Sequence, residues 1–217
     1  MEQTKVVAFV GIESYDLIHY LSRLIRKLGG KSLLVDYSDS RSLSHTINNP
    51  LVPDGEIVDY RGVDFITDSC DENLFSNYDY VFIDFGFNTR NPYLGHCEEI
   101  YFVTDLQRQN AARLRLVQPN DDQYCSLVIR EMVSSKVGAD AVKAQLPNIS
   151  FLEDDSNVYE IYADTANTST ALSIQYDNVF QFNRVSSDVK EFLFGFLSVD
   201  YDEKRLKAAF KAASKGK

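Results

Sequence analysis

The pattern of apolar residues in the first part of the chain predicts a strand, a helix and a second strand. Residues 6–10 form a continuous apolar run that stops at Gly11, which is typical of a strand buried on both faces. Leucine and isoleucine then recur on one helical stripe between residues 17 and 28, and two glycines follow that stripe. Residues 32–36 form another buried strand pattern that ends on an acid. This order indicates a βαβ unit, and therefore a parallel sheet with a right-handed crossover.

Similar apolar runs recur along the chain and predict a larger sheet. Further strands are expected at residues 56–60, 63–67, 80–84, 100–103 and 126–129. Residues 104–107 have the pattern of a capping box that opens a helix, and a late helix is expected from residue 188. Residues 150–185 carry no clear pattern. We therefore predict one doubly wound α/β domain over residues 1–200, with a mainly parallel sheet and helices on both faces, and a basic helical tail over residues 201–217.

Charge and composition narrow the classes of partner. The formal net charge is −10, so most of the surface would repel a duplex, and strong nucleic-acid binding is not expected. The tail is the exception, because it holds six basic residues against two acids. No apolar run reaches the length of a membrane span, and the first residues lack the pattern of a secretory signal. We therefore expect a cytoplasmic protein.

The carboxyl ends of the predicted strands are the place to look for a ligand. In a doubly wound sheet, ligands bind in the crevice beyond these ends. The candidate nucleotide-binding residues are Gly11, Ile12, Glu13, Ser14, Tyr15, Asp36, Asp84 and Gly86.

Two segments give these elements a family resemblance. The strand–loop–helix order, with LGGKSLLVD at residues 28–36 and YDYVFID at residues 78–84, resembles the ParA/MinD-like (SIMIBI-class) P-loop ATPases. The likeness covers residues 4–145 in element order. It implies a P-loop NTPase-like fold and a homodimer formed across the loop face. It also implies a role in positioning cargo such as chromosomes, pili, flagella or secretion machines in bacterial cells.

The phosphate-binding loop departs from the pattern of that family, KGGVGKT. Aligned without gaps, Gly11 keeps a glycine, and Ile12 is a mild change. Glu13 replaces the second glycine, Ser14 the phosphate-binding lysine and Tyr15 the magnesium-binding threonine. The upstream lysine and glycine are also missing, because the strand runs directly into Gly11. The resemblance therefore implies a degenerate member, a pseudo-ATPase similar to pilus-assembly relatives of the TadZ type.

Each replacement has a physical cost for phosphate binding. Glycines let backbone N–H groups curl around phosphates, and the lysine stabilises the charge on the transferred group. A phosphate here would instead meet Glu13 and Asp16. At an effective dielectric of about 20, each such like-charge pair at about 4 Å costs on the order of 4 kcal/mol. We expect no catalytic residue, no metal site and no cofactor. The alternative is a divergent NTPase that binds ATP and Mg²⁺ weakly and takes its lysine from elsewhere, such as a partner subunit.

The two acids at the strand ends admit two interpretations. In the resembled family, acids at the positions of Asp36 and Asp84 serve the attacking water and the magnesium shell. With the lysine gone, we favour a structural role in which they cap strand ends or polar loops.

Other candidate chemistries are weaker. A dinucleotide site would need three glycines after the first strand, and only Gly11 is present. His96 and Cys97 are adjacent on a segment expected to be extended, so their side chains should point apart and not form a catalytic pair.

The tail offers a second candidate contact surface. Leu206 and Phe210 lie on one helical face, and lysines lie near its edges. MinD-like proteins touch membrane with a C-terminal amphipathic helix, but two large apolar residues give weak affinity alone. A packed or solvated helix is the alternative that we favour. The residues that could contact a membrane or a partner are Lys204, Lys207, Phe210 and Lys211.

Taken together, the sequence favours a non-catalytic scaffold or positioning protein. It would localise or regulate a bacterial pilus, secretion, division or partition assembly through protein–protein contacts. Weak peripheral contact with the inner face of the membrane is possible through the tail.

Overall fold

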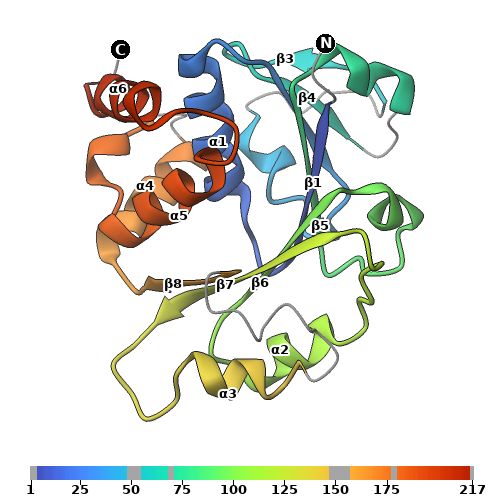
Figure 1. The fold of residues 1–217 in the computed structure, drawn as a ribbon, viewed down its shortest axis with the longest axis vertical. Helices are drawn as coiled ribbons and strands as arrows, with labels where there is room; N and C mark the ends of the chain where they lie inside the picture. Colours follow the sequence, from blue (N-terminus) through green and yellow to red (C-terminus); the bar gives the residue numbers. More distant parts are fainter. Residues whose placement is uncertain (1–3, 48–54, 68–70, 147–156, 177–179, 216–217) are drawn as a thin grey trace.

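One mainly parallel sheet organises the molecule. The computed structural model describes residues 4–47, 55–67, 71–146, 157–176 and 180–215, and within these it places eight strands in the order β3-β4-β2-β5-β1-β6-β7-β8 (Figure 1). The strands are β1 Lys5–Gly11, β2 Ser32–Asp36, β3 Val58–Asp59, β4 Asp64–Thr67, β5 Tyr80–Gly86, β6 Glu99–Thr104, β7 Tyr124–Met132 and β8 Val158–Tyr162. All neighbours pair in parallel except β3 and β4. The predicted α/β fold class is confirmed.

Helices cover both faces of the sheet. They are α1 Tyr15–Leu28, α2 Arg108–Leu114, α3 Ala139–Lys143, α4 Thr165–Tyr176, α5 Ser187–Leu197 and α6 Glu203–Ser214. In Figure 1, α1, α4, α5 and α6 gather on one side of the sheet, and α2 and α3 lie on the other.

Successive side chains of β1 point to opposite faces of the sheet and contribute to two apolar cores. Val7 and Phe9 belong to the core that also contains the buried faces of α1, α5 and α6. Ala8 and Val10 belong to the opposite core, beneath α2. Because successive strand residues point to opposite faces, a central strand covered on both sides must be apolar throughout. The continuous apolar runs in the sequence have this origin.

Helix α1 ends at the two glycines that the sequence predicts as its end. Gly29 adopts the left-handed conformation with φ of 90°, and its N–H donates to the carbonyl of Arg26. The N–H of Gly30 donates to the carbonyl of Ile25. These two bonds form the Schellman arrangement that glycine favours.

The predicted capping box after β6 is wrong. Thr104 ends the strand, and α2 begins at Arg108 with Gln107 as its N-cap, three residues later than the pattern suggested. The carboxylate of Asp105 accepts from the backbone N–H of Gln107 and from the side-chain amide of Asn110. A local side-chain turn therefore competes with the helix and delays it.

The segment without a clear sequence pattern contains β8 and α4. Residues 147–156 and 177–179 lie outside the described residues. Helix α4 has the sequence TANTSTALSIQY, in which small and hydroxyl residues replace an apolar stripe. Its buried positions include Asn167 and Thr170. Because these residues are polar, a search for apolar periodicity does not find the helix.

The basic tail forms α6, which packs on α1. Leu206 is fully buried, and Phe210 contacts the rings of Phe182 and Phe194 at centroid distances of 5.4 and 5.8 Å. Arg205 also donates to the carbonyl of Leu28 at 2.9 Å. The apolar face of this helix is therefore turned toward the core.

The exposed side of α6 carries the lysines. Lys204, Lys207 and Lys211 are exposed, and Lys207 pairs with Glu203 one turn earlier. Among the described helices, none is both long enough and apolar enough to cross a membrane.

The packing of α6 predicts a large effect from one substitution. Leu206→Ala should lower the free energy of unfolding by about 2–5 kcal/mol, because it removes a fully buried side chain. Urea denaturation of the full chain measures this. The exposed Lys211→Ala on the same helix should change the value by less than about 0.5 kcal/mol. Equal small effects from both variants would show that α6 is not part of the cooperative core.

Candidate functional site

The carboxyl ends of three adjacent strands form the candidate site. Strand β5 lies between β2 and β1, and the register places Asp36 beside Asp84. Val10 pairs with Gly86, one position after a register shift. The predicted site residues from β1, β2 and β5 are thus brought to one edge of the sheet.

The link between β1 and α1 is short and tight. Strand β1 ends at Gly11 and α1 begins at Tyr15, so three residues connect them. Gly11 has φ of +131°, and a Cβ there would lie 1.8 Å from the carbonyl oxygen of Val103. Only glycine fits this approach to the neighbouring strand. Ser14 is buried at the start of the helix, and its hydroxyl donates back to the carbonyl of Ile12 at 3.0 Å.

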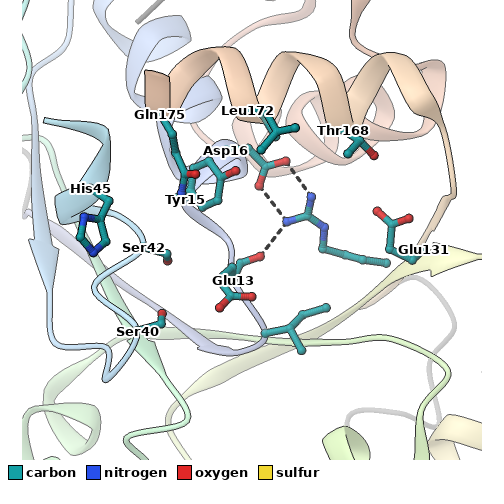
Figure 2. Close-up of a pocket in the computed structure, with 13 residues that line it drawn as sticks. Glu13, Tyr15, Asp16, Ser40, Ser42, His45, Glu131, Thr168, Leu172 and Gln175 are labelled. Carbon is teal, nitrogen blue, oxygen red and sulfur yellow. Dashed lines mark hydrogen bonds and ion pairs between the residues drawn. The ribbon is translucent and has the colours of Figure 1, made fainter. Parts of the chain in front are cut away.

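A buried ion pair lies at the N-terminal end of α1. Arg130, near the end of β7, donates to both carboxylate oxygens of Asp16 at 2.7 Å and to the carbonyl of Glu13 at 2.8 Å (Figure 2). The side chains of Asp16 and Arg130 are only 3% and 12% exposed. Such bidentate pairing is strong and directional. The carboxylate, set in the first turn, lies where the positive end of the helix favours negative charge.

Sequence reasoning placed Asp16 at the helix end but missed Arg130. The signal for Arg130 was its position, directly after the predicted strand at residues 126–129. A charged residue there lies at the ligand-binding edge of a parallel sheet.

Asp36 acts as an anchor for the loop that follows β2. Its carboxylate accepts from the backbone N–H groups of Ser38 and Ser44 at 3.0 and 2.7 Å. It also accepts from the hydroxyls of the same two serines at 2.7 and 2.6 Å. Four hydrogen bonds use the accepting capacity of the two oxygens. This arrangement fits the interpretation in which the acid caps a polar loop.

Asp84 is buried beside that loop. Its carboxylate accepts from the N–H of Gly86 at 2.9 Å and faces the hydroxyl of Ser42 at 3.4 Å. Burial raises the pKa of Asp84 to about 7, and the nearby charge of Asp36 adds to the increase. Gly86 itself has φ of +49°, and a Cβ there would lie 2.9 Å from Cβ of Ser38.

A cavity of about 460 Å³ opens beside the ion pair, between the β1–α1 link, the loop after β2 and α4 (Figure 2). Burial raises the pKa of the Tyr15 phenol in its wall to about 12. The side chains that line it are Ile12, Glu13, Tyr15, Asp16, Ser40, Ser42, His45, Arg130, Glu131, Thr168, Ala171, Leu172 and Gln175.

The cavity wall contains few basic groups. Apart from His45, its only basic residue is Arg130, whose guanidinium is already bound by Asp16 and Glu13. In the described part of the chain, no three His, Cys, Asp or Glu side chains lie together as metal ligands.

Comparison with known proteins identifies the fold. The chain resembles MinD in the MinC:MinD cell division complex of Aquifex aeolicus, with a TM-score of 0.62, 14% identity and coverage of 88% of this chain and 96% of that one. A ParA family ATPase from Chlorobium tepidum gives a TM-score of 0.56 at 12% identity, over 98% of each chain. Apo McdA from Cyanothece gives 0.57 at 11% identity, over 97% of this chain and 99% of that one. No family model and no curated protein matches the sequence. The chain therefore has the fold of ParA/MinD-type P-loop ATPases at low sequence identity.

The buried ion pair predicts a large cost when one partner is removed. Arg130→Ala should lower the free energy of unfolding by about 3–5 kcal/mol, because Asp16 would be left charged and buried. Urea denaturation measures the change, with the exposed Arg108→Ala as the matched control. An effect no larger than that of the control would mean that the pair is not formed in solution.

The raised pKa of Asp84 predicts a pH dependence of stability. Between about pH 4 and 7, folded Asp84 keeps a proton that the unfolded chain releases, so the free energy of unfolding should fall as the pH rises through this window. Asp84→Asn should remove this contribution. Denaturation at a series of pH values measures the slope, and the exposed Asp39→Asn should keep the slope of the unmodified chain. Identical slopes for all three proteins would contradict the assignment.

Proposed function

We propose that the chain is a non-catalytic scaffold or positioning protein with a ParA/MinD-type fold. It localises or regulates a bacterial assembly, of the pilus, secretion, division or partition kind, through protein–protein contacts in the cytoplasm. The observation that carries this proposal is the Asp16–Arg130 pair at the N-terminal end of α1.

The pair supports the loss of nucleotide hydrolysis because Asp16 places a carboxylate in the first turn of α1, the part of the helix that faces phosphate in P-loop proteins. In P-loop proteins, helix N–H groups and a lysine face the phosphates. Here a carboxylate of the chain itself lies in the first turn, and the guanidinium beside it is neutralised. A triphosphate would have to displace Asp16 and separate a buried ion pair.

The length of the link supports the same conclusion. A P-loop needs four residues between its first glycine and its Gly-Lys pair. Here β1 continues to Gly11, and only Ile12 separates Gly11 from Glu13 and Ser14, which take the places of that pair. The side chain of Ser14 also bonds back to the link itself. The backbone therefore has too little length to encircle a phosphate.

The matched structures support a protein partner as the ligand class. MinD in the structure from Aquifex aeolicus is part of a complex with MinC, another cell division protein. For this chain we propose a homodimer that keeps one state without a nucleotide switch, as in TadZ-type pilus-assembly relatives. The lysines of α6 remain candidates for contact with a partner or the membrane surface, whereas Phe210 contacts other core side chains.

Titration calorimetry with ATP and Mg²⁺ tests the absence of a nucleotide function. We expect no saturable heat, and phosphate release at the background rate in both the unmodified chain and Asp84→Ala. Binding with a micromolar Kd, or turnover that Asp84→Ala abolishes, would instead establish a divergent NTPase. A folded ParA-type ATPase, run in parallel, confirms that the assay detects binding and turnover.

A further inference from the structure

We propose that the cavity beside the Asp16–Arg130 pair receives a lysine or arginine side chain from an apolar segment of a partner protein. This inference rests on the proposed function, since it assigns a protein ligand to the space that a nucleotide would occupy. It specifies the chemistry of the partner, which the proposed function leaves open.

Charge favours a cation in this cavity. Asp16 and Arg130 neutralise each other, and Glu13 and Glu131 add two further carboxylates to the wall. Both glutamates are exposed, and neither carboxylate forms an ion pair or hydrogen bond with another residue in the described ranges. Figure 2 shows them on either side of the buried pair. A positively charged group placed between them would gain attraction from both, and an anion would be repelled.

The backbone holds one of these acids in an uncommon conformation. Glu131 has φ of +54°, in the left-handed region that side chains other than glycine rarely adopt. It lies where the register between β7 and β8 shifts, between Ile129 and Met132. A bulge of this kind re-aims side chains at the edge of a sheet. Here it brings the carboxylate into the cavity wall instead of leaving it in the strand pattern.

Apolar surface in the same cavity suits the aliphatic part of a basic side chain. Ile12, Ala171 and Leu172 line the wall together with the two glutamates. Lysine and arginine bury their methylene stems on apolar surface while their charged ends reach polar groups. A small inorganic cation would make no use of these contacts.

The surface beside the cavity extends the match to a protein segment. Helix α4 contains no charged residue, although a quarter of the chain is charged. Leu172 and Tyr176 on this helix are 48% and 80% exposed. A second hollow, lined by α4 residues alone, shares Thr168 and Leu172 with the main cavity. Apolar side chains that flank the basic residue of a partner would lie along this neutral face.

A second copy of this chain fits the surface less well. Each copy has a formal charge of −10, so two copies repel each other. The basic residues of α6 lie on a helix that packs against α1, and not on an extended segment that could enter the cavity of another copy. The acidic cavity therefore favours a different, basic partner, and the proposed homodimer must use a surface that leaves this cavity open.

Nuclear magnetic resonance titration of the isotope-labelled full chain tests the proposal. The probes are acetyl-Leu-Arg-Leu-amide and the same peptide with neutral citrulline in place of arginine. We expect the arginine peptide to shift the amide resonances of Glu13, Glu131 and Leu172 saturably at about millimolar concentration, and the citrulline peptide to leave them unchanged. Equal shifts from both peptides, shifts that map elsewhere, or no shift would overturn the proposal.

Variants separate the two parts of the contact. The double change Glu13→Gln and Glu131→Gln should weaken binding of the arginine peptide about tenfold. Leu172→Ser should weaken it by a smaller factor, and the exposed Glu203→Gln on α6 should not change it. Circular dichroism checks that each variant is folded. If a variant is unfolded, the comparison of the arginine and citrulline peptides on the unmodified chain still tests the proposal.

Two further titrations distinguish other occupants. Spermidine that binds as tightly as the arginine peptide would show that any small polycation suffices, which overturns the assignment to a protein segment. Saturable shifts of the same resonances by ATP and Mg²⁺ would contradict the proposed function itself. If neither the arginine peptide nor ATP with Mg²⁺ shifts these resonances, only this inference is wrong. The proposal of a non-catalytic scaffold would not be affected.

Discussion

The ion pair between Asp16 and Arg130 is the constraint on which the site depends. It joins the first turn of α1 to the end of β7, across 114 positions of sequence, and also holds the carbonyl of Glu13. A buried pair is costly to form but more costly to leave half formed. The carboxylate in the first turn of α1 is therefore bound by another residue of the same chain, Arg130. Because of that contact, the link is held at Glu13 and the guanidinium of Arg130 in the cavity wall is already engaged.

The elements around the site combine the sheet of ParA/MinD-type folds with acids that are engaged within the chain. Asp36 and Asp84 are still side by side at the strand ends, but hydrogen bonds from Ser38 and Ser44 engage the first, and burial holds the second. Hydroxyl groups thus occupy positions where a hydrated metal would compete for the same oxygens. Both acids are part of the hydrogen-bonded structure of the loops.

Much of the fold could be predicted from the sequence because its central strands are covered on both faces. Residues 6–10, 33–35 and 80–83 are apolar throughout for that reason, and Gly11 marks a point where another strand passes too close for a side chain. Helix α4 could not be predicted, since its buried positions include hydroxyl and amide groups. The role of Arg130 depends on a contact between distant residues, which no local pattern contains.

The short link after Gly11 also bears on how such a protein can change. If Glu13, Ser14 and Tyr15 were the only differences from a P-loop, three substitutions would be enough to create a phosphate site. A link that is too short cannot be repaired in this way, because added backbone is needed and α1 is fixed at its start by Arg130 and at its end by Gly29. A longer phosphate-binding loop at this position would require an insertion together with release of the ion pair, and single substitutions can supply neither change.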